Sequence, residues 1–272
     1  MNGNPASADL KREVREFWDQ NTCGTDATEE SRYSRAYFDE IEAYRYATEP
    51  EIFSFAQFTR FHGQKLLEVG VGAGTDFIQW VRAGTRAHGV DLTPTAVEHV
   101  RKRLEVYGLD AEEVRVADAE SLPFDNDSFD IVYSWGVIHH SPDTERALRE
   151  IVRVTQAGGT CKLMIYHRHS LFAVLMWVRH ALLRGRPWQS VAWCLDRYVE
   201  SRGTKAYTRS EVHSMLAALP VCDVAIATIL TDSDRLASSS RLPRALARWL
   251  AAMLGSRAGW FMTIEFRKEL AA

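Results

Sequence analysis

Short apolar segments alternate with segments of helical periodicity through the middle of the chain. The strand-like segments occupy residues 64–70, 86–91, 113–118, 129–134 and 160–166. Helical patterns fall between several of them, at residues 75–83, 94–107 and 143–155. This alternation is typical of βαβ units, which form a parallel sheet with helices on both faces and bind ligands at the carboxyl ends of the strands.

The rest of the chain departs from this alternation. Asp9 is a candidate N-cap for a first helix, and a charged, aromatic segment follows that helix. The helical and aromatic segment after residue 166 is too long for an ordinary connection. Near the end, strand-like segments at 221–230 and 260–266 flank an amphipathic helix predicted over 244–254, and these two segments could add an antiparallel end to the sheet.

We therefore expect four parts along the chain. They are an N-terminal helical lid (1–60), a ligand-binding core (61–166), a helical cap inserted after the fifth strand (167–207) and the C-terminal part of the core (208–272).

Composition places the chain among ordinary globular proteins, since 46% of its 272 residues are hydrophobic and 25% are charged. The net charge of -3 gives no basic field that would indicate a nucleic-acid partner. The cysteines include no CxxC pair, which argues against a zinc ribbon or a thioredoxin-type motif. The start lacks the pattern of a secretory signal and the longest apolar run, 171–178, is too short to span a membrane, so we expect a cytoplasmic protein.

The sharpest motif is LLEVGVGAGTD at residues 66–76, a strand that runs into Gly70, Gly72 and Gly74 and then into a helix. Glycine permits a tight turn and a close approach of the backbone to a ligand, and a helix N-terminus supplies free N–H groups. The GxGxG spacing differs from the GxGxxG of dinucleotide folds, and an acid, Glu68, stands two positions before the first glycine. The motif therefore points away from a pyrophosphate.

Two further carboxylates stand at the ends of the next two predicted strands. Asp91 ends the second strand, where it can accept hydrogen bonds from two ribose hydroxyls. Asp118 ends the third strand, one strand farther out in the sheet, where it can accept from an adenine amino group. Three consecutive strand ends thus offer a glycine loop, an acid and a second acid.

With these motifs the segment 64–166 resembles a class I S-adenosylmethionine-dependent methyltransferase, of the small-molecule group that includes the ubiquinone and menaquinone methyltransferases. The matching stretches, in order, are LLEVGVGAGTD, GVDLTP, ADAESLPFDNDSFDIVYSWGVIHHSPD and ALREIVRVTQAGGTCKLMIY. The resemblance implies a Rossmann-like α/β fold with a seven-stranded sheet whose last strand is antiparallel. It also implies S-adenosyl-L-methionine as the cofactor.

The resemblance further implies which residues bind that cofactor. Glu68, Gly70, Gly72 and Gly74 would line its methionine and ribose part, and Asp91 would bind the ribose hydroxyls. Adenine would lie against Leu92, Asp118 and Ala119, and the methionine moiety against Ser134, Trp135 and Val137. Methyl transfer would proceed by in-line attack of a substrate nucleophile on the sulfonium methyl, so the protein chiefly aligns the partners and excludes water.

Candidate catalytic residues follow the fourth and fifth strands. His139 and His140 could remove a proton from the acceptor, or could pack beside the cofactor and cap a loop; Tyr166 and His167 form a second candidate group. A metal site built from His139, His140, His167 or His169 would need a carboxylate in the right geometry, and the acidic ligand pattern of catechol-type methyltransferases is not apparent. We therefore predict no metal.

Three tyrosines, Tyr33, Tyr37 and Tyr207, are candidates for covering the cofactor or contacting the substrate, with helix packing as the alternative for the first two. Arg35 and Arg45 could each reach the cofactor carboxylate. The apolar insertion 167–207 suits a pocket for a lipophilic or aromatic substrate. Cap-domain core, a dimer contact and, together with 244–254, a membrane surface are the alternatives for it.

We conclude from the sequence that the chain is an enzyme that methylates a small, lipophilic or aromatic molecule on oxygen, nitrogen or carbon. Two other functions stay open: methylation of a peptide, which would require a broad groove, and nicotinamide-dependent oxidation or reduction on the same type of sheet. The GxGxG spacing and Asp118 argue against the second.

Overall fold

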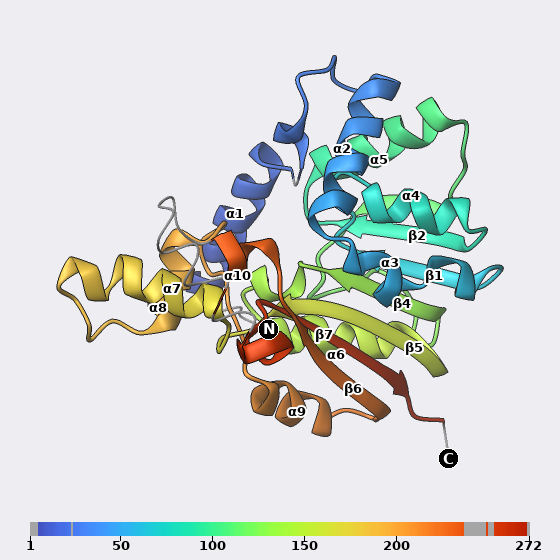
Figure 1. Cartoon of the computed structure of the whole chain (residues 1–272). Helices are drawn as coiled ribbons and strands as arrows, with labels where there is room; N and C mark the ends of the chain where they lie inside the picture. Colours follow the sequence, from blue (N-terminus) through green and yellow to red (C-terminus); the bar gives the residue numbers. More distant parts are fainter. Residues whose placement is uncertain (1–4, 23, 237–248, 250–252, 271–272) are drawn as a thin grey trace.

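Seven strands form one sheet in the computed structural model, which describes residues 5–22, 24–236, 249 and 253–270 (Figure 1). The strands are β1 (Lys65–Val69), β2 (Arg86–Asp91), β3 (Glu113–Val116), β4 (Phe129–Trp135), β5 (Thr155–Tyr166), β6 (Val221–Ile229) and β7 (Phe261–Lys268). Their order is β3-β2-β1-β4-β5-β7-β6. The chain runs outward from β1 through β2 to β3 and then crosses back to β4 on the other side of β1. The carboxyl ends of β1 and β4 therefore meet at a switch point, where ligands bind in α/β folds.

The predicted Rossmann-like fold is confirmed, including the direction of its last strand. The pairs β1–β2, β1–β4, β2–β3 and β4–β5 are parallel, whereas β7 runs antiparallel to both β5 and β6. The fifth strand is longer than the sequence pattern predicted, because it begins at Thr155 and continues through Gly158 and Gly159.

Alternate residues of the strands feed two separate cores. Leu66 of β1 packs on one face with Phe77, Trp80 and Val100, while Leu67 packs on the other face with Leu148 and Ile151. The first face is covered by α2 (Arg35–Thr48), α3 (Glu51–Ala56), η2 (Phe58–Phe61), α4 (Thr75–Arg82) and α5 (Pro94–Tyr107). The second face is covered by α6 (Thr144–Val154) and α9 (Arg209–Ala217), so helices lie on both faces as the pattern predicted (Figure 1).

The first helix begins earlier than predicted. Helix α1 spans Pro5–Gln20, so Asp9 lies inside it and is not its N-cap. Proline is well tolerated in the first turn of a helix because the missing N–H would have no helical partner there. The short helices η1 (Thr25–Ala27) and η3 (Ile138–His140) follow α1 and β4 respectively.

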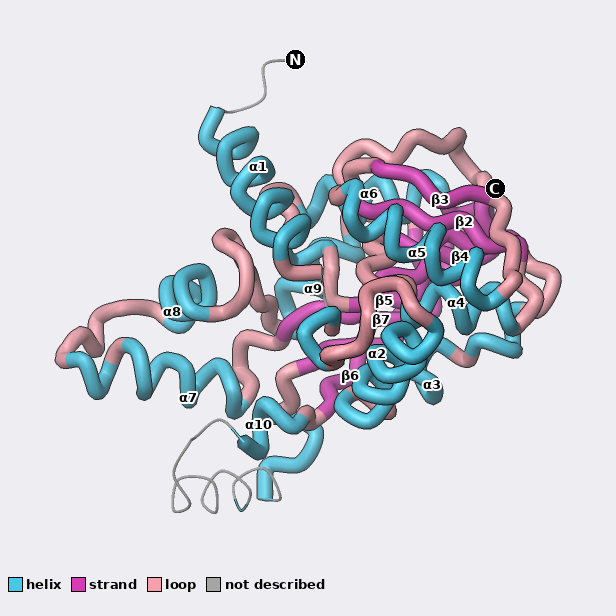
Figure 2. Tube along the Cα trace, turned by 90° about the horizontal axis from the view of Figure 1, so that it is seen from above, coloured by secondary structure: helices cyan, strands magenta, loops and turns pink. Residues whose placement is uncertain are grey.

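The insertion after β5 contains two helices that project from the body of the molecule (Figures 1 and 2). They are α7 (Leu171–His180) and α8 (Val191–Tyr198), joined through η4 (Leu182–Arg184). The buried residues of the two helices are Leu171, Ala173, Cys194 and Leu195, and Ala181, which follows α7, is buried as well. We call 171–198 the cap hairpin.

Two short helices, α10 (Asp232–Leu236) and η5 (Gly255–Ala258), complete the described elements near the end of the chain. The amphipathic helix predicted over 244–254 lies largely outside the described residues. Among the residues that are described, none of the helices combines the length and the apolar character needed to cross a membrane.

Candidate active site

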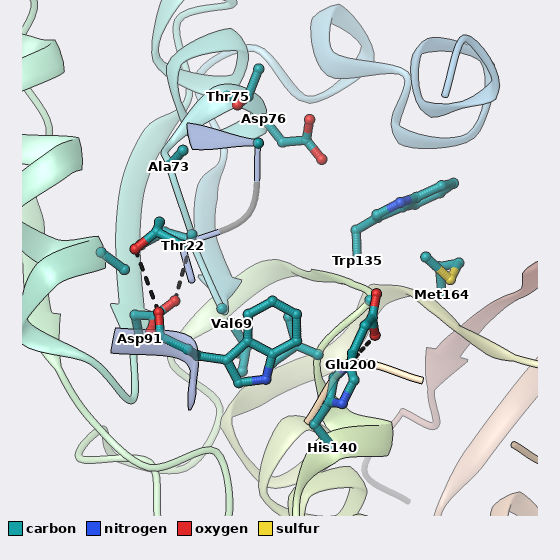
Figure 3. A pocket seen from close by; sticks show the side chains of 18 of the residues that line it. Thr22, Val69, Ala73, Thr75, Asp76, Asp91, Trp135, His140, Met164 and Glu200 are labelled. Atoms are coloured by element: carbon teal, nitrogen blue, oxygen red, sulfur yellow. Dashed lines mark hydrogen bonds and ion pairs between the residues drawn. The ribbon is translucent and has the colours of Figure 1, made fainter. Parts of the chain in front are cut away.

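A cavity of about 990 Å³ lies at the carboxyl ends of the central strands, under α1 and α2. Figure 3 shows Asp91 on one side of it and His140, Glu200, Trp135 and Met164 on the other. We call the first the glycine-loop side (Gly70, Gly72, Asp91, Asp118) and the second the histidine side (His140, Tyr166, Glu200). The two sides differ in chemistry and in how the chain builds them.

The glycines between β1 and α4 have conformations and surroundings that require glycine. Gly70 has φ 84°, and a Cβ built on it would lie 2.2 Å from Cγ2 of Val137, so no larger residue can occupy this position without movement. Gly72 has φ 50° and faces open space, which leaves its backbone free to approach a ligand. Gly74 is the N-cap of α4 and packs against Val100, outside the cavity lining.

Asp91 at the end of β2 ties this loop to the sheet. Its Oδ2 accepts from the N–H of Gly72 at 3.0 Å, and its Oδ1 accepts from the N–H and the hydroxyl of Thr93 at 2.9 and 3.0 Å. Burial raises the pKa of the Asp91 carboxyl despite these bonds. Carboxylate oxygens have further lone pairs, so the side chain can still accept from a ligand hydroxyl.

Helix α1 brings a cation to the outer end of the glycine-loop side. Lys11 Nζ lies 2.6 Å from Oδ2 of Asp118 and 2.5 Å from Oε2 of Glu120. The other oxygen of Asp118 accepts from the N–H of Glu120. Leu92 and Ala119 also line this end of the cavity. A base contacting Asp118 must therefore share this carboxylate with Lys11.

A buried acid stands at the base of the glycine loop. Glu68 is 3% exposed, and its Oε2 has no hydrogen-bond partner among the described residues. Burial, followed by the nearby charge of Asp76, raises the pKa of Glu68 well above its ordinary value. A cationic ligand at this place would stabilise the ionised form of Glu68.

Arg45 lies among the other acids of this region. Its Nη1 is 2.9 Å from Oε1 of Glu49 and its Nη2 is 3.6 Å from Oδ2 of Asp76. The indole N–H of Trp135 donates to the second oxygen of Glu49 at 2.6 Å. Arg35, the other arginine considered from the sequence, lies outside the cavity with its side chain 68% exposed. Of these two arginines, only Arg45 lines the cavity.

The histidine side combines residues that are far apart in the sequence. Tyr166 at the end of β5 donates its hydroxyl to Glu200, at 2.9 Å from both carboxylate oxygens. His140 Nε2 lies 3.2 Å from Oε2 of Glu200 (Figure 3). The rings of Trp18 and His140 make an edge-to-face contact with their centroids 5.1 Å apart. His139 is buried behind them, with its ring centroid 3.9 Å from that of Tyr166.

Residues 67–163 match the family model described as "Methyltransferase domain". Together with the sheet order and the glycine and acid loops at its switch point, this match decides the identity of the central segment. Residues 67–163 form a methyltransferase domain, and the sheet that contains them has the Rossmann-like fold of class I S-adenosylmethionine-dependent methyltransferases.

A curated relative matches the methyltransferase domain but not the rest of the chain. The methyltransferase domain region is 40% identical, over 99 residues, to phthiotriol/phenolphthiotriol dimycocerosates methyltransferase of Mycobacterium leprae, which is 36% of this chain and 36% of that protein. The match thus spans little more than a third of the length of this curated relative. The parts that flank the methyltransferase domain are therefore not accounted for by this relative.

Solved structures resemble the whole chain in fold. Geranyl diphosphate C-methyltransferase from Streptomyces coelicolor, solved with Mg²⁺, geranyl diphosphate and S-adenosyl-L-homocysteine, has a TM-score of 0.64 at 16% identity and covers 98% of this chain and 100% of that chain. Phosphoethanolamine N-methyltransferase 2 from Haemonchus contortus has a TM-score of 0.60 at 18% identity, covering 95% of this chain and 60% of that chain. At these identities the likeness shows the fold alone.

The structure brings most of the predicted site residues of the methyltransferase domain to the cavity. Those in its lining are Glu68, Gly70, Gly72, Asp91, Leu92, Asp118, Ala119, Trp135, Val137, His140 and Tyr166. Ser134 lies below the surface and donates to the carbonyl of Val69 at 2.9 Å, which ties β4 to β1. His139 does not line the cavity; its ring packs against His140 and Tyr166, which do.

Four other candidates stand outside the cavity. The ring of His167 bonds to the carbonyl of Gly259, and Tyr207 donates its backbone N–H to the carbonyl of Tyr166. Tyr33 and Tyr37 pack around His99, with the Tyr37 hydroxyl 3.1 Å from His99 Nε2. These side chains stabilise the surroundings of the methyltransferase domain.

Several residues that line the cavity lie outside the motifs identified in the sequence. They are Lys11, Trp18, Thr22, Glu49 and Glu200. The charged, aromatic composition of the first helix could have indicated Lys11 and Trp18 as residues that cover a site. Nothing in the sequence marks Glu200, because its place beside His140 depends on how the cap hairpin returns to the sheet.

Proposed function

We propose that the chain transfers the methyl group of S-adenosylmethionine to a small lipophilic or aromatic molecule. The observation that carries this proposal is a single cavity whose two sides suit two different partners. Pockets for a single drug-sized ligand have volumes of roughly 300–1,000 Å³. The volume of about 990 Å³ is at the upper end of that range, which suits a cofactor together with a small acceptor.

The glycine-loop side suits the cofactor. Gly70 and Gly72 allow its close approach, Asp91 accepts from the ribose hydroxyls, and the acids Glu68, Glu49 and Asp76 provide negative charge for the ammonium and sulfonium groups. Arg45 is placed among these acids, where it can bind the cofactor carboxylate.

The histidine side suits the acceptor. Trp135, Met164, Tyr166, Phe172 and Phe261 give it an apolar and aromatic lining. The acceptor would attack the methyl carbon in line with the leaving thioether, and the protein's contribution is to align the two and exclude water. A hydroxyl acceptor must also lose a proton, for which the groups around Glu200 are available.

The charges of the lining favour an acceptor without a phosphate group. Among the described lining residues the lysine and arginine side chains are Lys11 and Arg45, and each is already paired with acids. The names of the relatives include a lipid-type acceptor and a geranyl diphosphate acceptor, which supports an apolar substrate. A diphosphate, however, would meet mainly carboxylates in this cavity.

Calorimetry with the full chain tests the proposal. S-adenosylhomocysteine should bind with a stoichiometry of one per chain, and NADH should not bind. Binding of NADH without binding of S-adenosylhomocysteine would contradict the proposal and favour the oxidoreductase alternative. A screen of methyl transfer from labelled S-adenosylmethionine to phenols, alcohols, amines and model peptides would then identify the acceptor class, and transfer to peptides alone would overturn the small-molecule assignment.

A further inference from the structure

Three side chains with the chemistry of metal ligands converge on the histidine side. His139 and His140 belong to η3, and Glu200 follows α8; one ligand atom from each lies within 4.8 Å of the others. From the sequence, a histidine site at this place lacked a carboxylate. Glu200, brought in by the cap hairpin, is that carboxylate. Two imidazoles and one carboxylate are a donor set typical of zinc and of other divalent transition metals.

His139 has no partner for either ring nitrogen among the described residues, although its side chain is completely buried. A buried polar group without a partner costs about 1–3 kcal/mol. A bound ion would supply the partner that the described residues do not.

The hydrogen bonds of His140 orient its other nitrogen toward Glu200. Nδ1 lies 3.1 Å from the hydroxyls of Thr204 and Ser201. Because the Thr204 hydroxyl donates its proton to the carbonyl of Ser201 at 2.6 Å, it can only accept from Nδ1–H. With Nδ1 as the donor, the lone pair of Nε2 faces the Glu200 carboxylate at 3.2 Å, where a metal ion can bridge the two side chains.

Glu200 is held in place from its other side. The Tyr166 hydroxyl donates to its carboxylate, and the backbone N–H groups of Lys205 and Tyr207 donate to the carbonyls of His139 and Tyr166. Outer partners of this kind fix the orientation of metal-binding side chains. The partners of His140 and Glu200 thus have the arrangement that a metal site needs.

We propose that His139, His140 and Glu200 bind one divalent transition-metal ion, with zinc preferred by the donor set. Magnesium is disfavoured because it takes oxygen ligands almost exclusively. Since His140 and Glu200 line the cavity, an open coordination position would face the acceptor.

The use of this ion rests on the proposed methyl transfer. A metal-bound hydroxyl of the acceptor loses its proton to solvent more readily. The oxygen then forms a bond to the methyl carbon, the sulfur–carbon bond of the sulfonium breaks, and its electron pair stays on the thioether. This favours an alcohol or phenol as the acceptor.

Cobalt(II) titration of the metal-stripped full chain tests the site, in a Cys222→Ser background because Cys222 is an exposed thiol. We expect a visible absorption band that saturates at one Co²⁺ per chain and disappears when Zn²⁺ is added. His140→Ala and Glu200→Gln should lose the band. Thr204→Val, which removes one of the two hydroxyl partners of His140, should weaken the affinity by about 10–100-fold.

The matched control is His213→Ala, since this exposed histidine on α9 lies outside the cluster. It should bind Co²⁺ like the parent. Absence of a saturable band in the parent, or equal loss in His213→Ala, overturns the metal site. Calorimetry with S-adenosylhomocysteine on the same samples shows whether the variants are folded. It also separates the two proposals, because failure of cofactor binding with an intact Co²⁺ band would reject the methyl transfer and not the metal site.

Discussion

The glycine-loop side and the histidine side of one cavity are built from the chain in opposite ways. The motif residues of the first, between Glu68 and Asp118, lie at or just after the ends of the consecutive strands β1, β2 and β3, and Lys11 and Arg45 approach them from α1 and α2. Those of the second, with Trp18 of α1 packed on His140, join segments more than 180 residues apart, from Trp18 to Glu200. Local loops fix the first side, whereas tertiary contacts of the lid and cap fix the second. A cofactor common to many enzymes can be bound by a local motif, whereas the acceptor site depends on contacts between segments that are distant in the sequence.

The largest effect should come from the histidine side. His140→Ala should lower turnover by about 100-fold or more, because either a base or a metal ligand is removed. Affinity for S-adenosylhomocysteine should stay within about twofold, since His140 is not on the glycine-loop side. Steady-state kinetics and calorimetry on the same preparation measure both. His139→Ala should behave similarly if it is a ligand, and full turnover in both variants would reduce the pair to packing.

Asp91→Ala should produce the next largest effect, with the opposite distribution. Loss of hydrogen bonds to the ribose should weaken cofactor affinity by about 1–3 kcal/mol, or roughly 5–150-fold. Asp91 also orders the loop through Gly72 and Thr93, so the conservative Asp91→Asn, which keeps an acceptor oxygen, should lose less. Calorimetry measures the cofactor affinity of both variants, and unchanged affinity in Asp91→Ala would show that Asp91 does not bind the ribose.

Sequence reasoning succeeded where distance along the chain is short. The alternating strands and helices and the loop from Gly70 to Asp91 follow from apolar periodicity and glycine spacing, and the family resemblance implied the antiparallel last strand. It was wrong for the start of α1, where Pro5 opens the helix before Asp9. The Lys11–Asp118 ion pair and the approach of Glu200 to His140 join residues whose separation in sequence says nothing about contact. Such contacts follow from packing of the lid and cap, which no local pattern records.

A smaller effect should appear as pH dependence on the glycine-loop side. The pKa of Glu68 is raised in the free protein, so its contribution to folding stability is present at low pH and is lost as pH rises through that pKa. A cationic cofactor favours the ionised form, so binding should release a proton and affinity should rise with pH, by at most about tenfold per pH unit. The groups that face Glu68 are Asp76, Arg45 and Asp91.

Glu68→Gln provides the matched comparison for this effect. It should flatten the pH dependence of S-adenosylmethionine affinity, leaving the part due to Asp91, whose pKa burial also raises. S-adenosylhomocysteine lacks the sulfonium charge and should show a weaker slope in the parent protein. Calorimetry in buffers of different ionisation enthalpy counts the released proton, and an identical slope in Glu68→Gln would assign the titration to another group.

The smallest effect on the folded protein should come from the tip of the cap hairpin, which contributes no residue to the cavity lining. Leu183 and Trp188 are 76% and 74% exposed, so replacing both with serine removes little buried apolar surface. The free energy of unfolding should change by less than about 0.5 kcal/mol and turnover of a soluble acceptor should be unchanged. Thermal unfolding and kinetics measure these two quantities.

Because exposed apolar side chains near arginines suit a membrane surface or a second copy of the chain, sedimentation with anionic vesicles and sizing of the protein alone should be compared in the same variant. A loss of vesicle binding or of dimer would assign the tip to that contact. A loss of turnover would instead show that the tip belongs to the acceptor site, and the contrast between a local cofactor site and an assembled acceptor site would then extend through the whole insertion.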